Sequence, residues 1–133
     1  MRHPLRIAPA LAAGIALAVA ASAHHSYAMF DMAKEVTWTG TVDTFQWGNP
    51  HVWIYVDVQA TPDDPARAGR WGFEGPSSNI LARQGFSRNA LAHGDKITVV
   101  GHPVRDGSKV ASFSYIVDKD GNKMYADPGS KKD

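Results

Sequence analysis

The chain has 133 residues, no cysteine and a formal net charge of +1, from 14 Lys and Arg against 13 Asp and Glu. This length provides for one domain with one hydrophobic core. The absence of cysteine excludes disulfides, a lipid anchor on cysteine and a thiolate metal site. A charge so close to zero argues against a polyanion-binding surface, so we expect no nucleic-acid partner.

The chain begins with a pattern typical of a secretion signal. Arg2 and Arg6 precede an apolar run over residues 7–20, and Ala21-Ser22-Ala23 has small residues at the positions that a signal peptidase accepts. We therefore predict that residues 1–23 form a signal peptide cleaved after its last residue, with cleavage three residues earlier as the alternative. The mature protein would be periplasmic or secreted, with no stable membrane anchor. Loss of the two arginines leaves 12 basic against 13 acidic residues and changes the formal charge to −1.

Cleavage at the predicted bond would make His24 the first residue. Its free amine and imidazole Nδ1 can close a chelate ring, and His25 offers a second imidazole or its amide nitrogen. Nitrogen-rich sites of this kind suit Cu(II), which makes copper a candidate cofactor. A third ligand could come from His51, the best candidate, or from His93 or His102. One alternative is that the two histidines are simply polar residues after a cleavage site. Another is a copper-dependent oxidative enzyme, because histidine-brace enzymes also begin with histidine.

Two segments alternate between apolar and polar residues as strands do. Residues 35–43 place Val36, Trp38, Gly40 and Val42 on one face and threonines on the other. After a break at residues 48–50, residues 51–59 place Val52, Ile54, Val56 and Val58 on one face. The connection is too short for a crossover, so we expect an antiparallel pair.

Glycine, proline and aspartate residues mark the boundaries of the remaining predicted elements. They are a surface loop (61–69), a strand (70–74), a short helix (79–84), a turn (87–91), strands at 96–101 and 109–117, and an edge segment at 123–125. Ser77 or Ser78 is expected to cap the helix, Ile80 and Leu81 to supply its apolar contacts, and Gly85 to end it. Asp-Gly pairs at 106–107 and 120–121 predict tight turns.

Five or six short strands with one interposed helix predict a mainly β fold. We expect a small antiparallel barrel or sandwich, and the position of the helix favours an OB-like barrel. The domain would span residues 24–126, followed by a flexible tail over 127–133. His93 and His102 flank turn glycines and are expected to be solvated.

A string of motifs runs through the mature chain in a recognisable order. It resembles a family of small exported bacterial proteins that is known only as a domain of unknown function, and the resemblance covers essentially the whole mature chain. The resemblance implies an exported single domain and implies no activity. The motifs are His24-His25-Ser26, Phe30-Asp31, Gly40-Thr41-Val42, Phe45-Gln46-Trp47-Gly48-Asn49-Pro50-His51, Trp71-x-Phe73-Glu74, Leu81-x-Arg83-x-Gly85, Gly94-Asp95 and Gly101-His102-Pro103-x-Arg105-Asp106-Gly107.

Two further groups of residues are candidates for ligand binding. Asn49 and His51 could project from a loop toward a small ligand or metal, or Asn49 could satisfy backbone groups in a tight Asn-Pro connection. Glu74 and Arg83 could form a partly buried ion pair that holds the helix against the barrel, or Arg83 could bind an anionic ligand. In both cases the structural interpretation is the default.

The aromatic residues are expected to pack, and the sequence has no recognisable catalytic motif. Four tryptophans are many for one small domain, and their default role is packing in the core and at its rim, with a sugar or aromatic ligand as the alternative. We find no Ser-His-Asp order, no phosphate-binding glycine loop and no H-E-x-x-H motif. The sequence therefore predicts a non-enzymatic, exported binding or accessory domain whose partner is a small ligand or an envelope protein.

Overall fold

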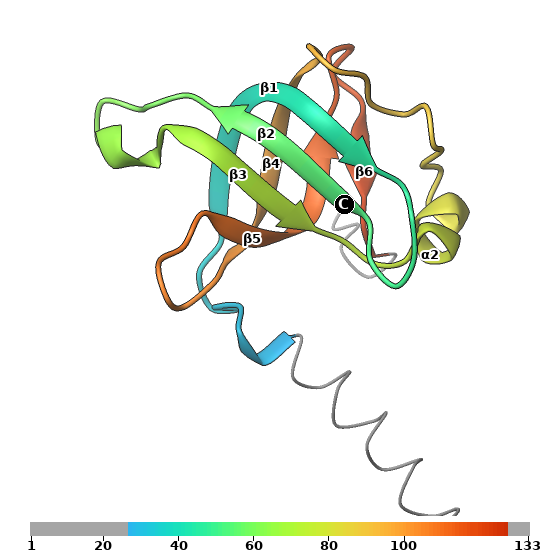
Figure 1. Ribbon diagram of the computed structural model, residues 1–133, viewed down its shortest axis with the longest axis horizontal. Helices are drawn as coiled ribbons and strands as arrows, with labels where there is room; N and C mark the ends of the chain where they lie inside the picture. The colour runs from blue at the N-terminus through green and yellow to red at the C-terminus, as the bar shows by residue number, and fades with distance from the viewer. Residues whose placement is uncertain (1–26, 128–133) are drawn as a thin grey trace, which may run out of the picture.

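The protein forms a small β-barrel with one helix at its side (Figure 1). The structure is a computed structural model that describes residues 27–127, so the predicted signal peptide, His24, His25 and the end of the tail lie outside the described residues. Its elements are β1 Val36–Gln46, β2 Trp53–Val58, η1 Pro65–Arg67, β3 Gly69–Glu74, α2 Ser78–Arg83, β4 Lys96–Pro103, β5 Val110–Val117 and β6 Lys123–Tyr125. Within the described part, no helix is long and apolar enough to cross a membrane.

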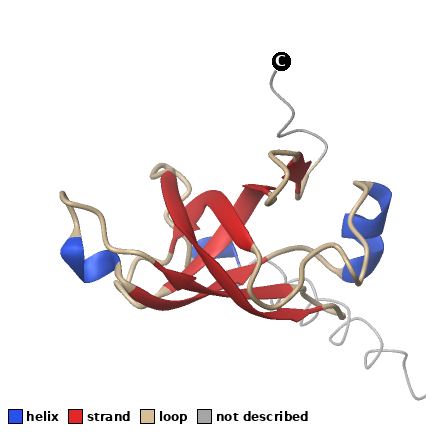
Figure 2. Cartoon of the chain, turned by 90° about the horizontal axis from the view of Figure 1, so that it is seen from above, coloured by secondary structure: helices blue, strands red, loops and turns tan. Residues whose placement is uncertain are grey.

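The barrel closes through a parallel pairing that the sequence did not indicate. β1 pairs antiparallel with β2 and with β4, β2 with β3, and β4 with β5. β3 then runs parallel to β5, from Gly72 opposite Val110 to Glu74 opposite Ser112. Figure 2 shows the strands curving into the barrel that this pairing closes. The predicted mainly β barrel with one short helix is confirmed, but the sheet is mixed rather than antiparallel. A parallel partner needs a long connection, which α2 and β4 supply here.

Two strands are irregular in their pairing, and in one of them the irregularity is at a glycine that permits close contact between neighbouring backbones. β1 is irregular between Val42 and Thr44, and β4 is irregular between Val100 and Gly101. A Cβ built on Gly101 would lie 1.9 Å from the carbonyl oxygen of Ser112 on β5. Strands that close a small barrel curve at irregular pairings and at glycines.

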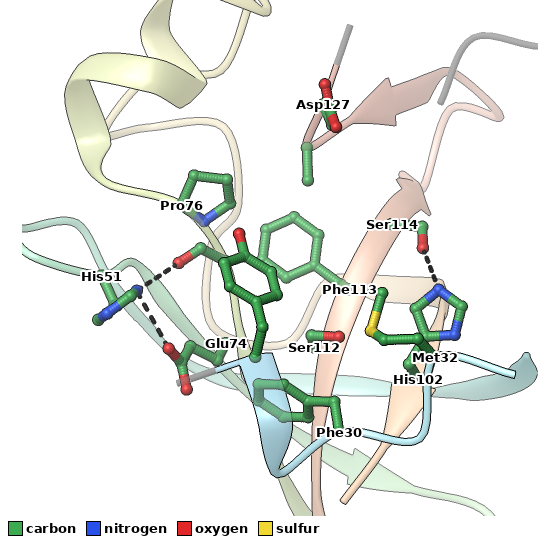
Figure 3. A pocket seen from close by; sticks show the side chains of 13 residues that line it. Phe30, Met32, His51, Glu74, Pro76, His102, Ser112, Phe113, Ser114 and Asp127 are labelled. Carbon is green, nitrogen blue, oxygen red and sulfur yellow. Dashed lines mark hydrogen bonds and ion pairs between the residues drawn. The ribbon is translucent and has the colours of Figure 1, made fainter. Parts of the chain in front are cut away.

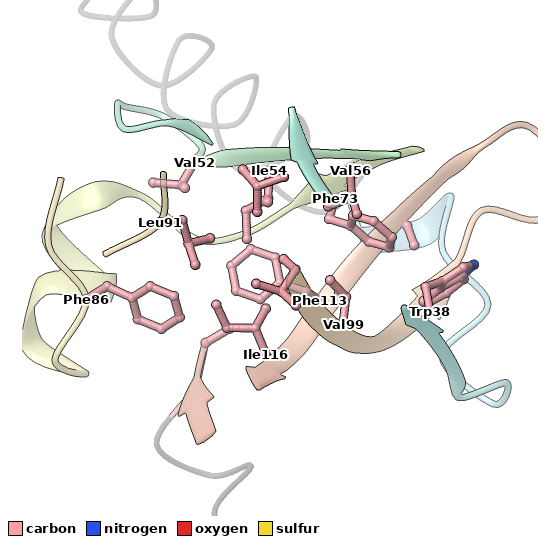
Figure 4. Close-up of a cluster of buried hydrophobic side chains, with 14 of the residues drawn as sticks. Trp38, Val52, Ile54, Val56, Phe73, Phe86, Leu91, Val99, Phe113 and Ile116 are labelled. Atoms are coloured by element: carbon pink, nitrogen blue, oxygen red, sulfur yellow. The ribbon is translucent and has the colours of Figure 1, made fainter. Parts of the chain in front are cut away.

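The hydrophobic core fills the inside of the barrel with the residues of the predicted inner faces (Figure 4). Trp38 is buried, and its ring centroid lies 5.1 Å from that of Trp71 and 5.2 Å from that of Phe73. The alternation predicted for β1 and β2 is therefore confirmed. Among the described residues, Trp38 Nε1 is the one buried side-chain nitrogen or oxygen with no hydrogen-bond partner.

The short helix α2 differs in detail from its prediction. Ser77 is the N-cap by backbone position, but its side chain makes no capping hydrogen bond, and Ser78 Oγ instead donates to Asn49 Oδ1 at 3.1 Å. Leu81 is buried as predicted. Ile80, by contrast, is 44% exposed, so its predicted packing role is wrong. Adjacent helical residues point about 100° apart, and this helix turns only one side to the barrel.

The turn between β5 and β6 has the geometry that the Asp-Gly pair predicts. Gly121 has a φ of +85°, which favours glycine. The carboxylate of Asp118 accepts hydrogen bonds from the backbone N–H groups of Asn122 and Asp120, both at 2.9 Å. These bonds, that of Asn122 above all, lower the pKa of Asp118 because they stabilise its charged form.

Candidate functional site

A cavity of about 160 Å³ lies beside the N-terminal segment, where the described chain begins. We call it the histidine pocket because two histidines contribute to its wall (Figure 3). It combines apolar side chains with several polar groups, a composition typical of small-ligand sites. Its lining residues are Tyr27, Phe30, Met32, His51, Glu74, Gly75, Pro76, His102, Ser112, Phe113, Ser114, Ala126 and Asp127.

His51 is held by hydrogen bonds on one of its two ring nitrogens. Its Nδ1 lies 3.0 Å from Glu74 Oε1 and 3.2 Å from the carbonyl oxygen of Gly75. A carbonyl oxygen can only accept, so Nδ1 carries a proton and donates. In the neutral ring the lone pair is then on Nε2. A histidine oriented in this way by a carboxylate and a carbonyl is prepared to bind a metal or to accept a proton through Nε2.

Backbone hydrogen bonds explain why His51 and Glu74 meet. The loop between β1 and β2 contains a cis Asn49–Pro50 bond and runs beside the segment that follows β3. The N–H of Gly75 donates to the carbonyl of Val52 at 2.9 Å, and the N–H of Val52 donates to the carbonyl of Pro76 at 3.0 Å. This pairing continues the β2–β3 ladder, so it places His51, just before β2, beside Glu74, the last residue of β3.

His102 forms the second polar corner of the pocket. Its Nδ1 lies 3.0 Å from the carbonyl oxygen of Lys34, so Nδ1 donates there as well. Its Nε2 lies 3.3 Å from Ser114 Oγ and therefore accepts from that hydroxyl. The expectation of a solvated His102 is wrong, because β4 continues two residues beyond its predicted end and carries this side chain across from β5.

The apolar walls come from the N-terminal segment and from the core. Phe30 and Phe113 are buried, whereas Tyr27 is 62% exposed and Met32 is 50% exposed. Figure 3 shows the sulfur of Met32 directed into the pocket beside His102. Exposed side chains of the N-terminal segment therefore form a partly open side of the pocket, over a floor of buried aromatic rings. A ligand entering here would meet aromatic rings, a thioether and two oriented imidazoles.

Not all of the predicted site residues meet at this pocket. Glu74 accepts a hydrogen bond from His51 and is not paired with Arg83, which is exposed on α2 and does not line the pocket. Asn49 bonds the side chain of Ser78 rather than backbone groups, and it too lies outside the lining. His24 and His25 lie outside the described residues, so the predicted terminal chelate has no described geometry.

The sequence interpretation missed Met32 and Ser114, and it named His102 only as an alternative third metal ligand while expecting it to be solvated. His102 was within reach of sequence reasoning because it belongs to the Gly101-His102-Pro103 motif. His93 is exposed, as predicted, and its Nδ1 lies 2.9 Å from the carbonyl oxygen of Asp43. Across residues 27–127, no group of three or more His, Cys, Asp or Glu side chains is arranged to hold a metal ion.

Comparisons with known proteins identify the family of the chain and give no activity for it. A comparison with curated proteins finds no match. One family model, described as a family of unknown function (DUF6152), matches residues 13–113 and so includes His51, Glu74 and His102. This match confirms the predicted membership of an uncharacterised family. The chain belongs to the family of unknown function DUF6152.

Proposed function

We propose that this protein is an exported, non-enzymatic binding domain that holds a small ligand in the histidine pocket. The observation that carries the proposal is the fixed orientation of His51 and His102, whose Nδ1 atoms both donate to backbone carbonyls. Oriented polar groups in a partly apolar cavity give a site its specificity. The cavity volume of about 160 Å³ fits an ion or a small molecule.

We also propose that the barrel is OB-like. Five strands close into the barrel and α2 lies between β3 and β4, with β6 added at the edge of β5. OB-fold barrels use the surface of two strands and the loops around it for binding. In this chain the loop between β1 and β2 supplies His51 to the pocket, which agrees with a binding role for that end of the barrel.

Native mass spectrometry of the protein purified from the cell envelope tests this function. We expect a mature chain that starts at His24 and carries an additional bound mass. A His51→Ala/His102→Ala double variant should lose the bound mass because both oriented imidazoles are removed. His93→Ala is the matched control, since His93 also bonds a backbone carbonyl but does not line the pocket. Retention of the bound mass by the double variant would contradict the proposed site.

A second candidate function, copper binding, is favoured by the position of Tyr27. Tyr27 and His51 line the same pocket. Three residues of extended chain span at most about 11 Å, so His24 cannot be farther than that from Tyr27. We propose that the His24 amine and imidazole, with His25 and the Nε2 atom of His51, bind Cu(II). The described residues contain no three-ligand group, so this site depends on the terminal histidines.

Titration of Cu(II) into the mature protein tests the terminal chelate. One alanine added before His24 should weaken Cu(II) binding by more than about 100-fold, since loss of even an outer-shell partner costs about 10–100-fold. His51→Ala should weaken it as well, whereas His93→Ala should not. Affinity should fall with decreasing pH, because the amine and the imidazoles must lose protons to bind. Equal affinities for the wild type and the alanine-extended protein would show that the amine is not a ligand.

A further inference from the structure

A second cavity adjoins the same N-terminal segment, and its charged lining is mainly basic. This basic cavity has a volume of about 360 Å³ and lies between the N-terminal segment, η1, β3 and the β4–β5 loop. Four basic side chains and two acidic ones contribute to its wall, together with the indole of Trp71. The charged residues are Lys34, Arg67, Arg105, Lys109, Asp31 and Asp64.

The two carboxylates neutralise only half of this positive charge. Asp64 Oδ2 lies 3.2 Å from Arg67 Nε, and Asp31 Oδ1 lies 3.8 Å from Arg105 Nη1. Among the described residues, Lys34 and Lys109 form no ion pair. The ammonium group of Lys109 instead donates to the carbonyl of Ala68. Two positive charges of the cavity therefore lack a negative partner in the described structure.

The arginine and the indole in this cavity are held in place before any ligand arrives. Arg67 donates through Nε to Asp64 and through Nη1 to the carbonyl of Thr37 at 2.9 Å. This arrangement leaves Nη2 for an additional acceptor. Trp71 Nε1 donates to the carbonyl of Arg67 at 2.8 Å, so the indole is fixed to the same turn. A planar cation beside a rigid aromatic wall suits a planar carboxylate.

Two aromatic rings of the core pack against Trp71 and hold its indole in place at the side of the basic cavity. Its ring lies 5.1 Å from the buried Trp38 ring and is stacked on Phe73 at a centroid distance of 6.2 Å. Trp71 itself is half-buried, so one part of the indole packs on the core and another part faces the cavity. An aromatic ligand that lies against this indole gains contact area and places its charged group near the cations.

We propose that the basic cavity binds a small aromatic carboxylate, with its ring on Trp71 and its carboxylate between Arg67, Lys34 and Lys109. The positive charge left over by the two aspartates selects an anion, and the indole wall selects a flat ring over a bare ion. This site is separate from the histidine pocket and does not depend on a metal.

Titration of the mature protein with benzoate, followed by two-dimensional NMR, tests this site. We expect benzoate to shift the indole N–H signal of Trp71 and the backbone signals of the β4–β5 loop. Benzamide, which has the same shape and no charge, should bind much more weakly. Benzoate affinity should fall as salt rises, because the charges are near the surface. Inorganic phosphate is the probe for an anion site without a role for the ring, and it should bind more weakly than benzoate.

A pair of matched charge variants makes the test quantitative. Lys34→Gln/Lys109→Gln should weaken benzoate binding about five- to tenfold, as expected for two partly exposed charge contacts. Arg83→Gln/Arg88→Gln removes the same charge from exposed positions outside the cavity and should leave the affinity unchanged. His51→Ala/His102→Ala should also leave it unchanged. Equal losses in the two charge variants, equal binding of benzamide, or equal binding of phosphate would overturn the proposal.

Discussion

Gly101→Ala is expected to destabilise the fold by about 3 kcal/mol, the upper part of the range for overpacking a close-packed interior. A Cβ at this position would lie 1.9 Å from the carbonyl oxygen of Ser112 and 2.8 Å from the Cα of Phe113. Both atoms belong to the backbone of β5, so they cannot move away unless the β4–β5 pairing shifts. Urea denaturation followed by tryptophan fluorescence measures the change in the free energy of unfolding.

Gly48→Ala is the matched control for this prediction. No heavy atom lies within 4 Å of a Cβ built on Gly48, so the added methyl group meets open space. The substitution should change the free energy of unfolding by less than about 0.5 kcal/mol. If Gly101→Ala were as stable as Gly48→Ala, the close approach of β4 and β5 would not exist in solution.

Phe73→Ala should destabilise the protein by about 3–5 kcal/mol, because it removes a fully buried ring and leaves a cavity. Phe73 has 0% exposure and lies opposite Ala111 in the parallel β3–β5 pairing that closes the barrel. Its ring also packs edge-on against Trp38 at a centroid distance of 5.2 Å. Thermal unfolding measures the loss of stability, and near-ultraviolet circular dichroism reports the loosened tryptophan environment.

Ile80→Ala tests the orientation of α2 at an exposed position, where little loss of stability is expected. Sequence reasoning assigned Ile80 to the helix contact with the barrel, whereas its side chain is 44% exposed in the structure. Its replacement should cost less than about 0.5 kcal/mol, the usual range for surface positions. A cost similar to that of Phe73→Ala would contradict the orientation of α2 described above.

The first two strands were predictable because each alternates in a way that local sequence reveals, and the later ones because turn residues bound them. Residues 36–42 and 52–58 turn every second side chain inward, and the Asp-Gly pairs mark the turns between later strands. The helix was predictable in position but not in orientation. Its six residues make less than two turns, so the helical period cannot show which of Ile80 and Leu81 is buried.

The histidine pocket was predictable only in part, because its contacts join residues far apart in the chain. His51 was identified from its loop, and Glu74 from its place at the end of an aromatic strand. Their pairing was missed because Glu74 was matched with Arg83, which lies on the helix that follows its strand. His102 was named only as an alternative metal ligand, and its place in the pocket wall was missed because its partner is the carbonyl of Lys34, which is 68 residues away.

The sequence by itself determined the mainly β class, the positions of the strands and turns, and the membership of a family. These properties depend on local periodicity, turn chemistry and motif order. Only the tertiary structure decided that β3 runs parallel to β5, that Glu74 meets His51, and that His102 lines a pocket. The physical reason is that barrel closure selects which strand edges and loops come together, and local alternation is the same for every partner a strand could take.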